Sequence, residues 1–326
     1  MESTAPTANP SALHRLRSLL VELEDLKRQQ PAHYAQSIAS TLFVESWQRL
    51  LAGEDAERVA TTITTKAIVA VLLPGCDAHF VREAELEKSA VVEIYQKALR
   101  TSTRERLNNA LYERLSASIP PLVNEYFAQT ASEQLPEPDF QKQAWFVNVL
   151  CQQPRAGATK PGRPRMLLVP PEMHSDHCLT TAVFAVLLSP IFGASPGLPF
   201  LTGLSHHLHN AVLPDCGFGG EVLLDAWLGD IIARARSKAL ARLDPTLAQR
   251  VREAIGTHEN LGLAAGRAAS AADVLDRVLD VKWRTRAAQV KDKDILEELD
   301  LVHEGPIKRF QTEILNATNV WQRREA

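Results

Sequence analysis

One long uncharged stretch, from Cys178 to Ser205, most constrains what this chain can fold into. It is apolar enough to be buried, but Pro190, Pro196 and Pro199 interrupt it, and prolines kink or end helices. The stretch therefore predicts a buried helix of about three turns, a turn-rich loop and the start of a second helix. Neither helix would be long enough to cross a bilayer of about 30 Å, so we expect two core helices and no membrane span.

Histidines gather on both sides of this apolar stretch. Between Pro171 and Asp225 lie five of the ten histidines of the chain, namely His174, His177, His206, His207 and His209. A buried imidazole needs a partner for each ring nitrogen, and one metal ion satisfies several imidazoles at once. The two clusters therefore predict a metal centre.

The remaining sequence predicts an all-α protein, because apolar residues recur at helical spacing and no segment alternates as a strand does. A proline-rich and cationic run, Gln152 to Arg165, divides the chain. We therefore expect a helical N-terminal region over residues 1–150, an exposed linker over 151–166 and a metal-binding domain over 167–326.

Composition restricts the partners. A net charge of -3 gives no general attraction to nucleic acid or to an anionic membrane. The four cysteines form no CxxC pair, which is typical of free thiols and favours a cytoplasmic protein. A helix capped by Ser11 carries a short heptad seam, which predicts either a homodimer contact or packing within the chain; its residues are Ala12, Leu16, Leu19, Leu23 and Leu26.

The order of motifs after Met173 resembles the HD superfamily of metal-dependent hydrolases. His177 opens a long apolar helix, FLTGLSHHLHNA resembles the His-Asp doublet motif with His206 at its histidine, and AADVLDRVLD resembles the closing motif with Asp273. The resemblance covers about a third of the chain and implies an HD-like helical bundle preceded by the helical N-terminal region.

The chain departs from that family at the doublet, where His207 replaces the aspartate. An imidazole rarely bridges two metals, so we expect a mononuclear site of His177, His206, His207 and Asp273. His258 is either a fifth ligand or, as in some members of the family, the ligand of a second metal. Such a histidine-rich set favours iron, zinc, manganese, cobalt or nickel over magnesium. Whether His174 or His209 is also a ligand stays open.

Two carboxylates near the doublet are candidate catalytic residues. Glu221 is the candidate general base, and Asp215 could act in the same way or orient a ligand imidazole. Cationic groups of the linker could balance the charge of a substrate phosphate; they are Lys160, Arg163 and Arg165.

We therefore expect a metal-dependent hydrolase that acts on a small phosphorylated, nucleotide-like substrate. One alternative is an HD-type non-haem iron oxygenase. The other is a catalytically inactive HD-like scaffold for signalling or assembly.

Overall fold

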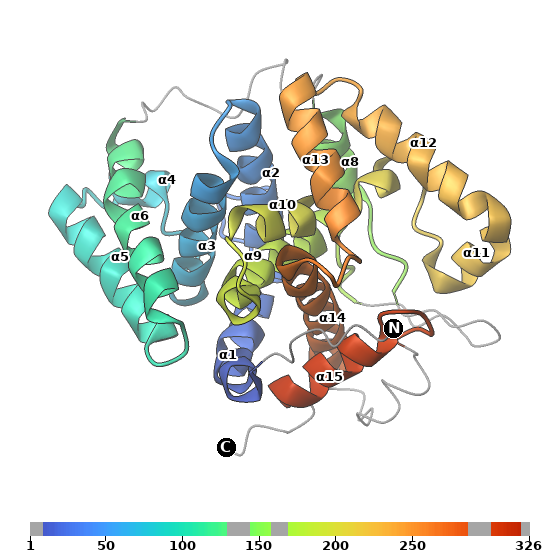
Figure 1. Cartoon of the computed structure of the whole chain (residues 1–326). Helices are drawn as coiled ribbons and strands as arrows, with labels where there is room; N and C mark the ends of the chain where they lie inside the picture. Colours follow the sequence, from blue (N-terminus) through green and yellow to red (C-terminus); the bar gives the residue numbers. More distant parts are fainter. Residues whose placement is uncertain (1–8, 129–143, 158–168, 286–300, 321–326) are drawn as a thin grey trace.

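The computed structural model describes residues 9–128, 144–157, 169–285 and 301–320, and within them the protein is all-α (Figure 1). No β-strand occurs in these ranges; a single isolated antiparallel bridge joins Pro154 to Met173. The first half contains α1 (Pro10–Leu23), the 3-10 helix η1 (Glu24–Lys27), α2 (Ile38–Leu51), α3 (Ala56–Leu72), α4 (Ala78–Glu83), α5 (Lys88–Thr103), α6 (Asn109–Ala128) and α8 (Trp145–Gln152). The second half contains α9 (His174–Phe192), α10 (Gly197–Ser205), η2 (Leu208–Ala211), α11 (Gly217–Leu224), η3 (Asp225–Trp227), α12 (Leu228–Leu240), α13 (Pro245–Thr257), α14 (Ala264–Thr285) and α15 (Lys308–Thr318).

Helix α9 is the central element of the fold. It lies between α10 and α14 and also contacts α2 from the first half of the chain. Its hydrophobic residues are buried all round the helix, as expected for a helix that neighbours enclose on every side. By length and composition alone α9 could span a membrane, but 89% of that window is buried inside the protein, so it is the core helix of this fold.

The helix α9 is longer than the sequence predicted. The three-turn prediction was wrong, because the chain passes through Pro190 and ends only at Gly193, whose φ of 75° is left-handed. A proline in the last turn removes only one of the final hydrogen bonds, and a glycine then ends the helix without strain.

Glycine also determines how closely α10 approaches α9. A Cβ on Gly203 would lie 2.6 Å from both the Cα and the nitrogen of Ala182. The two helices therefore contact through backbone at this point, one turn before the histidine doublet.

The two halves of the chain share one hydrophobic core. Helix α1 packs against α15, and α3 packs against α10. The leucines of the predicted seam are all between 0% and 2% exposed within the chain itself; they are Leu16, Leu19, Leu23 and Leu26. A homodimer through these side chains would require them to leave the core.

Two further local predictions were wrong. The cap of α1 is Asn9, whose side chain accepts from the backbone of Ser11 and Ala12, and not Ser11 itself. The sequence also predicts one helical run from Glu221 to Ala241. The structure has two α-helices there, because the backbone breaks at Asp225, where φ is 39°.

Candidate metal centre

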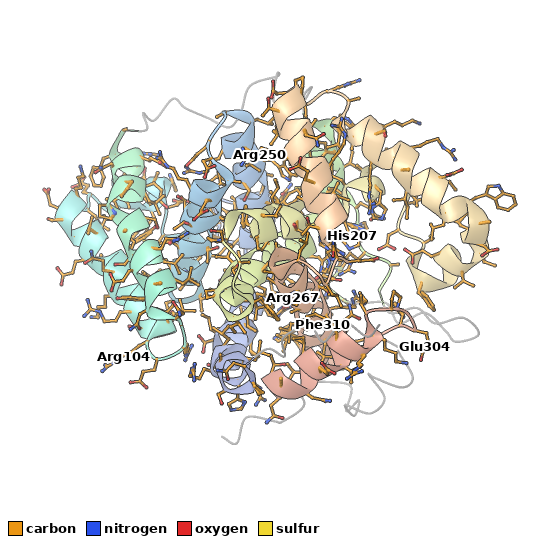
Figure 2. The ribbon with its side chains drawn as sticks, in the orientation of Figure 1. Arg104, His207, Arg250, Arg267, Glu304 and Phe310 are labelled. Atoms are coloured by element: carbon orange, nitrogen blue, oxygen red, sulfur yellow. The ribbon has the colours of Figure 1, made fainter. Side chains whose placement is uncertain are left out.

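Four separate elements bring the predicted ligands together. His177 lies in the first turn of α9, and His206 and His207 follow the last residue of α10. His258 follows α13, and Asp273 lies on α14. Because α10 and α14 both pack along α9, residues almost a hundred positions apart reach one place. Figure 2 marks it at His207, near the end of α13.

The imidazole rings of His206 and His207 lie close together because α10 ends at Ser205, directly before them. In a continuous helix neighbouring side chains diverge by about 100°. Here His206 caps α10, and His207 has φ -97° and ψ 17°, outside the helical pattern. As a result, the two ring centroids are 4.2 Å apart, and each lies within 5.0 Å of the His177 ring.

The central donor atoms are spaced as ligands of one ion would be. His177 Nε2 lies 3.0 Å from His206 Nε2, and Asp273 Oδ1 lies 3.3 Å from the first and 3.8 Å from the second. Metal–ligand bonds of about 2.0–2.1 Å place neighbouring donors about 2.9–3.4 Å apart when the bond angle is between right and tetrahedral. The donor–donor distances of 3.0 and 3.3 Å fall within this range, and the distance of 3.8 Å is longer.

The other ring nitrogen of each imidazole has an oxygen partner. His177 Nδ1 lies 2.5 Å from Asp276 Oδ2, and His206 Nδ1 lies 2.7 Å from the carbonyl of Gly203. His207 Nδ1 lies 2.9 Å from Asn210 Oδ1. These oxygens accept, so each Nδ1 carries the proton and each Nε2 keeps its lone pair. Outer partners of this kind orient the histidine ligands of metal sites.

A second group of possible ligands consists of His206, His258 and Asp273, and it shares His206 with the group of His177, His206 and His207. His258 stacks on His206 with ring centroids 4.8 Å apart, and its buried Nε2 has no hydrogen-bond partner. Asp273 Oδ2, 3.7 Å from that nitrogen, is bound by Arg277 at 2.7 Å. The donors of His177, His206 and His207, and separately those of His206, His258 and Asp273, lie within 4.8 Å of one another and could hold a metal ion.

The shifted pKa values of these histidines and of Asp273 favour the protonation states that bind a cation. Burial lowers the pKa of His206, His207 and His258, and neighbouring imidazoles lower those of His206 and His207 further. Burial alone would raise the pKa of Asp273, but the charge of Arg277 and contacts with the imidazoles hold it well below its ordinary value. At neutral pH His206, His207 and His258 are therefore neutral imidazoles, and Asp273 is an ionised carboxylate.

Sequence reasoning missed the buried charges behind His177. Lys27 Nζ lies 2.6 Å from Glu172 and 2.7 Å from Asp276, and its side chain is 1% exposed. Glu172, His177 and Asp276 form a third group with metal-ligand spacing, but the Lys27 ammonium already neutralises its carboxylates. Asp276 had a sequence signal, since it lies three residues after Asp273 and hence on the same helix face. Lys27 and Glu172 had none, because only the fold brings η1 to α14.

The centre opens into a pocket of about 410 Å³, within the usual range for small-molecule sites. His206, His207, His258 and Asp273 line it, together with the two candidate catalytic residues. Burial and the charge of Asp215 raise the pKa of Glu221, as a general base requires.

The carboxylate of Asp215 binds backbone N–H groups of the surrounding loops. It accepts hydrogen bonds from the backbone of Ala156 and Gly217, each at 2.9 Å. Although burial opposes it, the charge of Arg155 and these bonds lower the pKa of Asp215. The geometry suits an anchoring role better than a basic one.

The remaining sequence candidates lie around the centre. His174 Nδ1 is 3.0 Å from the carbonyl of Gln153, and its Nε2 is 3.5 Å from Asp215, so its ring joins neither central donor group. His209 lines the pocket but is likewise in neither group. Lys160, Arg163 and Arg165 lie outside the described residues. Within the described start of the predicted linker, Arg155 lines the pocket and Ala156 is buried.

Comparison of the chain with protein-family models, with curated proteins and with solved structures finds no match. The resemblance to HD proteins therefore stays a prediction from motif order, and the function must be argued from the site.

Proposed function

We propose that this protein is a metal-dependent hydrolase of phosphate esters. The observation that carries the proposal is a pair of overlapping donor groups beside a ligand-sized pocket, one of His177, His206 and His207 and the other of His206, His258 and Asp273. Iron, zinc, manganese, cobalt or nickel suits this donor set.

The surrounding residues supply what hydrolysis needs besides the ion. A bound divalent metal polarises a phosphoryl oxygen and lowers the pKa of a water molecule. Glu221 would accept a proton from the attacking water, whose oxygen forms the new bond to phosphorus, and would return it to the leaving oxygen as that oxygen's bond to phosphorus breaks. Arg155 lines the same pocket and adds positive charge near the phosphoryl group.

Elemental analysis of protein purified without added metal tests the proposal directly. We expect about one transition-metal ion per chain, lost on chelation together with some thermal stability. Phosphate release from a panel of phosphate esters should appear with at least one of iron, zinc, manganese, cobalt or nickel.

Matched variants connect metal and activity to the centre. His206→Gln and Asp273→Asn should each lose metal and phosphate release together, whereas the exposed His14→Gln should keep both. A metal-loaded protein that hydrolyses nothing in a broad panel would overturn the hydrolase proposal. Metal-free protein whose stability is unchanged on mutating His206 and His207 would favour the scaffold alternative.

The oxygenase alternative predicts about two irons per chain and an absorbance change that depends on oxygen. The third donor group, which a second iron could otherwise use, holds the Lys27 ammonium instead. A second iron would therefore have to bind the group of His206, His258 and Asp273, which shares His206 with the first group.

A further inference from the structure

Helix α12 forms one wall of the pocket with a defined stripe of side chains. Leu228, Ile232 and Arg236 follow one another at four-residue spacing, so they share one helix face, and all three line the pocket. The wall is therefore apolar over its first two turns and cationic at the third.

Arg236 is the arginine of this pocket that forms no ion pair in the described part of the chain, although the charge of Glu259 acts on it from beyond 4.0 Å. Of the other arginines that line it, Arg155 pairs with Glu172 at 3.3 Å and Arg277 pairs with Asp273 at 2.7 Å. Arg236 has no carboxylate oxygen within 4.0 Å in the described part of the chain, and its Nε is buried without a hydrogen-bond partner. An unsatisfied buried donor of this kind is costly unless a ligand accepts from it.

The position of Arg236 is beside the metal centre. Helix α12 packs on η2, which carries His209. Arg236 and His209 both line the pocket. The His209 ring lies 5.7 Å from the ring of His207.

The charges around the pocket limit how many anionic groups it accepts. Glu172, Asp273 and Asp280 pair with lysine or arginine side chains. The other lining carboxylates have no lysine or arginine nitrogen within 4.0 Å in the described ranges; they are Asp215, Glu221 and Glu259. These negative charges oppose a ligand that carries several phosphates.

We propose that Arg236 binds the substrate phosphoryl group and that Leu228 and Ile232 bind the leaving group, which makes the substrate a phosphate monoester of an apolar or aromatic alcohol. The inference rests on the proposed hydrolase function, which it deepens. The guanidinium offers two parallel donors to phosphoryl oxygens, and the apolar turns of α12 bury a hydrophobic group.

Non-hydrolysable phosphonates test this inference by calorimetric binding, without turnover. The metal-loaded protein should bind phenylphosphonate more tightly than methylphosphonate, and methylenediphosphonate no more tightly than methylphosphonate. Arg236→Gln should weaken binding of both monophosphonates about tenfold or more. Ile232→Asn should weaken phenylphosphonate several-fold and leave methylphosphonate unchanged.

The control is Arg234→Gln, an exposed arginine on the same helix, which should change neither affinity. Should Arg236→Gln fail to fold, Arg236→Lys replaces it and should weaken binding about threefold, because an ammonium lacks the paired donors. Unchanged affinity in an Arg236 variant that keeps its metal, or tightest binding of the diphosphonate, would overturn the inference. Phosphonate binding that depends on Arg236 in a protein without phosphatase activity would instead uphold this subsite and reject the hydrolase function.

Discussion

The proton on each clustered imidazole is placed by a single oxygen atom. Asp276 holds the proton of His177 on Nδ1 across 2.5 Å, and the Gly203 carbonyl does the same for His206. With those protons placed, two Nε2 lone pairs lie 3.0 Å apart, an arrangement that a cation between them and Asp273 relieves.

We predict that Asp276→Asn weakens metal affinity about 10- to 100-fold, because a neutral amide holds the His177 proton less firmly. Competition with a chromophoric chelator measures the affinity. The exposed Asp230→Asn on α12 is the control. Equal affinity in the two variants would show that Asp276 does not act on the centre through His177.

At the scale of elements, η1 and α14 meet through buried charge. Lys27 from η1 contacts Glu172 ahead of α9 and Asp276 on α14, so one ammonium joins three segments. Burial alone would lower the pKa of Lys27, but the surrounding carboxylates raise it well above its ordinary value, so this lysine stays charged.

We predict that Lys27→Met lowers the free energy of unfolding by about 3–5 kcal/mol, because it leaves buried carboxylates without their counter-charge. Urea denaturation measures the loss, and metal content should fall with it. Lys97→Met, an exposed substitution on α5, should change stability little. A Lys27→Met protein as stable as the parent would mean that the carboxylates become protonated at little cost.

The contact between α9 and α10 gives a second prediction at this scale. Gly203→Ala places a methyl group 2.6 Å from the Ala182 backbone, which should separate the helices and lower the free energy of unfolding by about 1–3 kcal/mol or more. Because His206 follows on the same helix, metal affinity should fall as well.

The matched control is Gly229→Ala in α12, where an added Cβ meets nothing within 4 Å. Alanine there should stabilise the protein by up to about 1 kcal/mol through helix propensity. If the two alanine variants behave alike, the close approach at Gly203 does not limit the packing.

At the scale of the whole molecule, the buried histidines predict acid sensitivity. Burial is the main cause that lowers the pKa of His174 and of His209 from 6.5 to about 4. Between pH 6.5 and about pH 4, His174 and His209 bind protons in the unfolded chain but not in the folded chain. The free energy of unfolding of the metal-free protein should therefore fall as pH decreases from 6.5 to 4.

Glu172 extends this dependence to lower pH. Burial would raise its pKa, but Lys27 and Arg155 lower it from 4.5 to about 2, so its stabilisation is lost as pH falls through that range. Urea denaturation of the metal-free protein at pH values between about 7 and 4 tests the histidine part, and His209→Gln should reduce the slope. A free energy of unfolding independent of pH over this range would contradict it.

The sequence by itself determined the helical class, the burial of the segment after Cys178 and most candidate ligands. The first two follow from local rules, because helical periodicity is written in neighbouring positions. Asp273 and the ligand histidines could be named because the order of their motifs resembles that of the HD superfamily.

Only the tertiary structure decided which of these groups meet and what lies behind them. Lys27 and Arg236 bear no local signal, since their roles depend on η1 reaching α14 and on α12 folding over the pocket. In a continuous helix the adjacent rings of His206 and His207 would diverge, yet the end of α10 brings both rings close to His177. The physical reason is that burial and charge pairing arise between segments distant in the chain, where packing across the whole core sets the distances.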